Sequence, residues 1–129
     1  MKKENIIRVL MVAPHEPPEV TYLENKLEVL QTAVSIGADY RGLIEIVGLS
    51  EDTCIVCHEE GKLIGLPPNR RLGRDILCGV FYIAGQNKDG DLTSLTEAQI
   101  ATYTNRFAEP EDIPEHEVGH TLIIDFEII

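Results

Sequence analysis

Apolar residues form two patterns in the first third of the chain, and each predicts a different element. Residues Ile6 to Ala13 (IIRVLMVA) are almost continuously apolar, which predicts a buried β-strand ended by Pro14. Further on, apolar residues recur every three or four positions, as in a helix with one buried stripe. The stripe consists of Val20, Leu23, Leu27, Leu30 and Val34. We therefore expect a helix that begins near Pro18 and ends at Gly37.

The middle of the chain predicts four strands, because its apolar segments are short, β-rich and separated by turns. They are Gly42–Leu49, Thr53–Glu59, Lys62–Leu66 and Ile76–Gly85. Glu60-Gly61 supplies a turn, so the Lys62–Leu66 strand should run back as a hairpin partner of the strand before it. The intervening segment Pro67 to Asp75 (PPNRRLGRD) is expected to be an exposed loop.

A second helix and a last strand are expected near the C-terminus. Thr96 with Gln99 three residues later matches a capping box, which marks the start of a helix. The apolar side of this helix would consist of Ile100, Tyr103 and Phe107. Residues 109–117 are acidic and contain prolines, so we expect a loop. Apolar and acidic residues alternate over Leu122 to Ile129 (LIIDFEII), which predicts a strand.

These elements give the order β-α-β-β-β-β-α-β and predict an α+β fold. We expect a mixed, mostly antiparallel sheet with both helices packed on one face. Residues 1–108 would form a single domain. Residues 109–129 would add an acidic loop and a C-terminal strand that packs on the same domain or on a neighbouring subunit. The chain has no apolar run long enough to cross a bilayer, and its N-terminus is better explained as a strand than as a signal peptide, so we expect a cytoplasmic protein.

The net charge of −11, from 22 acidic and 11 basic residues, changes which partners are plausible. Such a charge repels phosphates and argues against sequence-independent binding to nucleic acid. It suits a basic protein partner or mimicry of DNA, although the scattered acids also fit a plain solvated surface. The three cysteines are an odd number, which argues against a disulfide framework.

The segment His116 to His120 (HEVGH) matches the H-E-x-x-H pattern of zinc metalloproteases. A zinc site of this kind needs both histidines on one helix face and a third ligand downstream. Pro114 precedes the motif, Gly119 lies inside it, and no histidine or cysteine follows it. We therefore interpret the match as accidental, with a catalytic zinc site as the alternative.

The cysteines offer a second possible metal site at Cys54 and Cys57, to which Cys78 could contribute. Chelation by a C-x-x-C pair needs a tight turn, whereas this segment is predicted to be a strand. Two residues three apart on a strand point to opposite faces. We therefore expect the cysteines to be buried apolar side chains, and we expect no bound metal.

The segment Leu66 to Arg74 contains the most promising candidate binding site. It carries Asn69, Arg70, Arg71 and Arg74 in an otherwise acidic chain, and arginine presents donors that fit phosphate or carboxylate groups. This predicts an anion-binding loop for a nucleotide-like ligand. The alternative is that Arg70 and Arg74 pair with carboxylates of the same domain and only fix the loop.

A second candidate lies between the first strand and the predicted helix, at Pro14-His15-Glu16-Pro17-Pro18. Free N–H groups at a helix N-terminus attract anions, so this connector with His15 could bind one, and Tyr22 and Asn25 in the predicted helix could line a shared pocket. Glu16 and Glu19 already place negative charge there, so a rigid connector is the simpler interpretation.

Five segments together resemble a known family. They are EVTYLENKLEVLQ (19–31), GLIEIV (42–47), EEGKLIGLPPNR (59–70), GVFYIAG (79–85) and GDLTSLT (90–96). Over about residues 6 to 107 the chain resembles domain of unknown function 3846, most specifically in the LPxNR stretch that ends at Arg70. The family name implies no activity. The resemblance implies small proteins of phages, conjugative elements and gut Firmicutes, where such proteins often counter host defence.

These observations leave three hypotheses for the function. The first is a non-enzymatic accessory protein, acting in counter-defence, that binds a small anionic or nucleotide-derived ligand through Asn69 and the neighbouring arginines. The second is an acidic protein–protein inhibitor or DNA mimic, and the least favoured is a zinc hydrolase that uses HEVGH. We expect no cofactor. We also expect a homo-oligomer, because the last strand would leave an apolar edge or face uncovered.

Overall fold

A computed structural model of the chain describes residues 5–118. Its elements are β1 (Ile6–Val12), β2 (Glu19–Glu24), α1 (Leu27–Val34), β3 (Ile44–Ser50), β4 (Thr53–His58), β5 (Pro68–Leu72), β6 (Asp75–Cys78), β7 (Phe81–Gln86), β8 (Leu92–Thr93) and α2 (Glu97–Arg106). Residues 115–118 form a further helical turn.

The strands form one large and one small sheet. The large sheet has the order β2-β1-β7-β4-β3, with β8 also paired to β7, and β5 pairs with β6 in the small sheet. Each pairing within the described part of the chain is antiparallel. The predicted α+β fold with a mostly antiparallel sheet is therefore confirmed.

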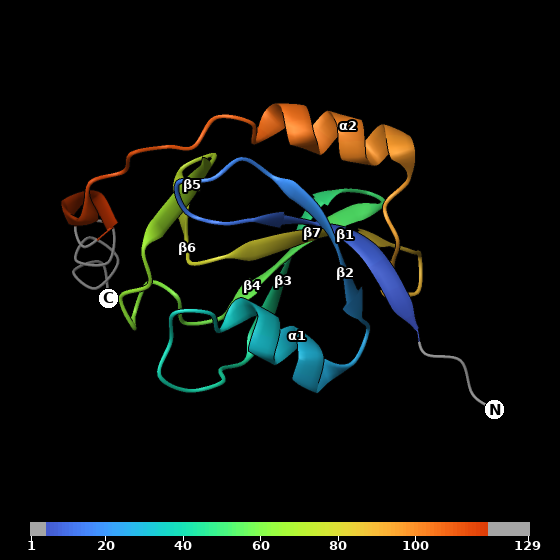
Figure 1. Cartoon of the computed structure of the whole chain (residues 1–129), viewed down its shortest axis with the longest axis horizontal. Coiled ribbons are helices and arrows are strands. Elements are labelled where there is room, and N and C mark those ends of the chain that lie inside the picture. The colour runs from blue at the N-terminus through green and yellow to red at the C-terminus, as the bar shows by residue number, and fades with distance from the viewer. Residues whose placement is uncertain (1–4, 119–129) are drawn as a thin grey trace.

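The two helices cover opposite faces of the large sheet (Figure 1). Leu30, Ala33 and Val34 of α1 pack against one face. Tyr103 of α2, with Phe107 directly after the helix, packs against the other. Our prediction that both helices share one face is wrong. The central strands β4 and β7 are buried on both faces, so each face needs its own cover.

The predicted helix over residues 18–37 is half wrong. Its first part is the strand β2, which forms a hairpin with β1, and only Leu27–Val34 is helical. Val20, Thr21 and Tyr22 are β-branched or aromatic and suit a strand. The apparent helical stripe joined apolar residues of a strand to those of the helix that follows it, and Leu27 is more than half exposed.

Three further expectations in the middle of the chain are wrong. The expected strand Lys62–Leu66 forms turns, and the expected loop Pro67–Asp75 contains β5. The apolar run Ile76–Gly85 is divided into β6 and β7 by Gly79. At Gly79 the backbone has φ 83°, a conformation that favours glycine, and its N–H donates to Pro67 O at 2.7 Å.

Other expectations are confirmed. The strands β1, β3 and β4 lie where the apolar segments predicted them, and α2 begins with the predicted capping box of Thr96 and Gln99. Each of those two side chains accepts a hydrogen bond from the other's backbone N–H. Among the described residues, no helix is long and apolar enough to cross a membrane. The predicted strand Leu122–Ile129 lies outside the described residues.

Candidate functional site

Asn69 and Arg70, two of the residues expected to bind an anion, lie in the interior at the start of β5. Their exposed fractions are 0% and 1%. The Asn69 side chain donates from Nδ2 to Val12 O and to Gly79 O, both at 2.8 Å. Asn69 therefore joins the end of β1 to the turn between β6 and β7.

Arg70 uses every donor of its guanidinium group within the protein. Nε and Nη2 donate to Phe107 O at 3.3 and 3.0 Å, and Nη2 also donates to Glu16 O at 2.6 Å. Nη1 donates to Asn69 Oδ1 at 2.7 Å and to Asn69 O at 3.4 Å. A cation at Phe107 O also compensates the negative end of the α2 dipole. Burial lowers the pKa of Arg70, against the opposing effect of Glu111.

The loop after β1 is shaped so that it presents Glu16 to Arg70. Glu16 N donates to Ala13 O at 3.2 Å, and His15 has φ 67°. Proline in the second position and positive φ in the third are typical of a type II turn. His15 is therefore a turn residue with an exposed side chain.

The remaining arginines of the predicted loop differ from each other. Arg71 forms ion pairs with Glu111 at 3.4 Å and with Glu117 at 2.7 Å, which fixes the segment after α2 on β5. Arg74 is exposed in the turn between β5 and β6. The alternative expected Arg70 and Arg74 to pair with carboxylates, but among the described residues the loop's ion pairs are those of Arg71, and Arg70 bonds to carbonyl oxygens instead.

The structure does not gather the predicted ligand-binding residues into one pocket. Asn69 and Arg70 are interior, Arg71 is paired, and Arg74 and His15 lie in turns. Tyr22 is 62% exposed on the edge strand β2 and not on a helix. Anion binding through Asn69 and Arg70 stays a prediction, and a ligand would first have to displace their backbone partners.

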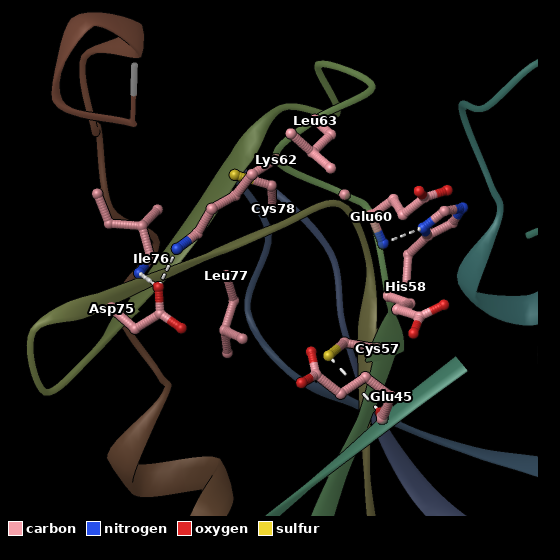
Figure 2. A pocket seen from close by; sticks show the side chains of 12 residues that line it. Glu45, Cys57, His58, Glu60, Lys62, Leu63, Asp75, Ile76, Leu77 and Cys78 are labelled. Atoms are coloured by element: carbon pink, nitrogen blue, oxygen red, sulfur yellow. Dashed lines mark hydrogen bonds and ion pairs between the residues drawn. The ribbon is translucent and has the colours of Figure 1, made fainter. Parts of the chain in front are cut away.

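A cavity of about 250 Å³ lies instead between the ends of β3 and β4 and the strand β6. Figure 2 shows Cys57 and Glu45 on one side of it, and Lys62 with Asp75 on the other. Its charged lining residues are Glu45, Glu59, Glu60, Asp75 and Lys62. Since Lys62 is already paired with Asp75, the cavity presents a surplus of carboxylates.

A second cavity, of about 410 Å³, adjoins the first and shares His58 and Glu60 with it. It is bounded by the segment 37–42, which contributes Asp39, Tyr40 and Arg41. His58 Nδ1 accepts a hydrogen bond from Glu60 N at 2.9 Å, as Figure 2 shows, and the ring lies against Gly42. His58 and Glu60 therefore form a wall that the two cavities share.

The cysteines are free and buried. Cys54 packs on the α1 face and Cys57 on the α2 face, which confirms that they point to opposite sides of β4. Burial raises the pKa of Cys54 to about 11 and that of Cys57 to about 12, and it also raises the pKa of Cys78. These thiols stay protonated at neutral pH, where only the thiolate is a good nucleophile.

The HEVGH motif is only partly described. His116 and Glu117 lie in the helical turn 115–118, and His120 lies outside the described residues. The Glu117 carboxylate accepts a hydrogen bond from Arg71, which lowers the pKa of Glu117. Between residues 5 and 118 no three His, Cys, Asp or Glu side chains are grouped so that they could hold a metal ion.

Sequence reasoning missed the acidic cavities, because their residues come from separate turns and strands. Glu45 lies on β3, Glu59 and Glu60 follow β4, and Asp75 begins β6. The only sequence signal was the net charge, which gives the excess of carboxylates but not their placement.

Comparison with known proteins assigns most of the chain to a family. A family model described as a domain of unknown function (DUF3846) covers residues 7–108. The matched range ends beside Phe107, the residue whose carbonyl accepts from Arg70. No curated protein and no solved structure matches the chain.

Proposed function

The chain belongs to the DUF3846 family, and on that premise we propose that it is a non-catalytic protein that binds a basic protein partner through its acidic cavities. One observation carries this proposal: the described surface has a surplus of unpaired carboxylates, because most of its cations are already used.

Most cationic side chains in the described part of the chain already have partners within the protein. Arg70 is buried among carbonyl groups. Four other cations pair with carboxylates of the same domain, namely Arg8, Lys26, Lys62 and Arg71. The acids that line the first cavity, in contrast, have the single ion pair Lys62–Asp75 among the described residues, whereas the second cavity is also lined by Arg41.

This distribution favours a cationic partner over an anionic ligand. A lysine or arginine side chain entering the first cavity would meet Glu59 and Glu60, whereas a phosphate there would be repelled. The state of the reactive groups also supports binding rather than catalysis. The thiols are protonated, and Glu117 is engaged by Arg71.

The test uses a capped tetra-arginine peptide, with a tetra-glutamate peptide as its counterpart, titrated into ¹⁵N-labelled protein. We expect amide shifts at Glu59, Glu60 and Gly61 with tetra-arginine alone. They should weaken as salt shortens the screening length from about 10 Å at 0.1 M to about 3 Å at 1 M.

Two variants of equal charge change show whether the cavity is responsible. The double substitution Glu59→Gln and Glu60→Gln should abolish the shifts, whereas Glu97→Gln and Glu109→Gln, far from the cavity, should leave them unchanged. Shifts that favour tetra-glutamate, or that are the same in both double variants, would reject the proposal. Shifts that favour tetra-glutamate would support an anionic ligand instead.

A further inference from the structure

The outer edge of β3 is a hydrogen-bonding surface with which no described strand pairs. Within residues 5–118, β3 is the last strand on its side of the large sheet. Glu59 N donates to Leu43 O at 2.9 Å, so the backbone groups of residues 43, 45 and 47 face β4, up to the β-bulge between Gly48 and Ser50. By the alternation of an antiparallel pair, the N–H and C=O groups of Ile44, Ile46 and Gly48 point away from the sheet.

The two edges of the sheet differ in how they are protected. The opposite edge strand β2 follows two prolines and carries Glu19 and Glu24 at its ends, as edges that resist pairing commonly do. The strand β3 (IEIVGLS) has only Glu45 as a charged residue. Ile46 is 43% exposed, and Leu43, which directly precedes the strand, is 60% exposed. Apolar surface therefore accompanies the outward-pointing backbone groups.

We propose that this edge pairs with the same edge of a second copy, antiparallel about a two-fold axis at Ile46. In this register, residues whose backbone N–H and C=O groups point away from the sheet pair with residues of the same kind in the second copy. Ile46 exchanges both hydrogen bonds with Ile46 of the second copy, and Ile44 does so with Gly48 of the second copy on each side. The large sheets of the two copies then become one continuous sheet, and the interface is isologous.

The side chains of the same register are complementary. Glu45 lies opposite Val47 of the second copy, whereas an axis at Glu45 would place two carboxylates directly opposite each other. The register applies from Ile44 to Gly48, because a β-bulge follows between Gly48 and Ser50.

This inference does not depend on the proposed binding function, and the two respond to salt in opposite ways. Two copies that each carry a charge of −11 repel each other, so pairing through backbone groups and apolar contacts should strengthen when salt screens that repulsion. Binding of a basic peptide should weaken under the same conditions.

The test is sedimentation equilibrium of the full chain over low to high micromolar concentrations. We expect a monomer–dimer equilibrium. Ile46→Lys, which brings two ammonium groups together at the axis, should weaken the dimer at least about tenfold. Val20→Lys is the matched control, since Val20 is 42% exposed on the opposite edge and should leave the dimer unchanged.

A charge placed opposite Glu45 tests the register. Val47→Glu brings a carboxylate opposite Glu45 of the second copy, twice, and should weaken the dimer several-fold, whereas adding Glu45→Lys should restore it. A chain that is monomeric throughout overturns the proposal, and so does a dimer unaffected by Ile46→Lys. A dimer that Val20→Lys disrupts equally is a third contrary result, because it would place the interface elsewhere.

Discussion

Replacing Arg70 by alanine should destabilise the fold rather than remove a binding site. The substitution removes all the donors that reach Phe107 O, Glu16 O and Asn69 Oδ1. These acceptors lie at the end of α2, in the loop after β1 and on β5, so one side chain holds three segments together. The loss leaves them without their partner in a site that is 1% exposed.

The size of the effect follows from the number of acceptors left unpaired. Each buried acceptor without a partner costs about 1–3 kcal/mol, and water entering the space left by the side chain would recover part of this cost. We expect a loss of about 4 kcal/mol in the free energy of unfolding, out of the roughly 5–15 kcal/mol typical of a domain. With a urea m-value of about 2 kcal/mol/M, the midpoint should fall by about 2 M.

Urea unfolding followed by circular dichroism measures this change. Arg70→Lys keeps the charge but loses the planar fork, so it should lie between Arg70→Ala and the wild type. Arg74→Ala is the matched control, and on the exposed turn it should change the free energy by less than about 0.5 kcal/mol. The reasoning fails if Arg70→Ala is as stable as Arg74→Ala.

Three further predictions concern other parts of the molecule. Gly42→Ala should cost about 1–3 kcal/mol in urea unfolding, because a Cβ there would overlap the His58 ring. Burial raises the pKa of Cys57 from its ordinary value of 9.0 to about 12. As the pH rises, the unfolded chain therefore loses this proton before the folded chain does, and the free energy of unfolding should decline between pH 9 and 12. The decline should be less steep in Cys57→Ala. Arg71 lowers the pKa of Glu117 below 4.5, so this pairing contributes above that pH and is lost as the pH falls through the lowered value. An NMR titration should show the Glu117 pKa rising toward 4.5 in Arg71→Ala.

Each of these has a comparison that could contradict it. Gly48→Ala should be tolerated where Gly42→Ala is not, since a Cβ at Gly48 meets no atom within 4 Å. A decline between pH 9 and 12 that is equally steep in Cys57→Ala and wild type would show that this thiol does not set the pH dependence. An unchanged Glu117 titration in Arg71→Ala would mean that another group lowers its pKa.

Some elements could be predicted because their signal is local. The apolar run of β1 and the capping box of Thr96 and Gln99 need only neighbouring residues, and both were found correctly. The opposite orientation of Cys54 and Cys57 also followed from the period of a strand. The acidic cavities could not be predicted in the same way, because their carboxylates come from β3, the turn after β4 and β6.

The sequence by itself determined the α+β composition, the acidic charge and the strands β1, β3 and β4. Only the tertiary structure decided that Val20 and Leu23 belong to a strand, because β2 pairs with β1. It also decided the role of Arg70. An arginine in a proline-rich polar segment suggests an exposed binding loop, but this one donates to Glu16 O and Phe107 O, which are 54 and 37 residues away in the chain. Backbone carbonyls carry no signature of side-chain type, so no local pattern shows which residue will bond to them.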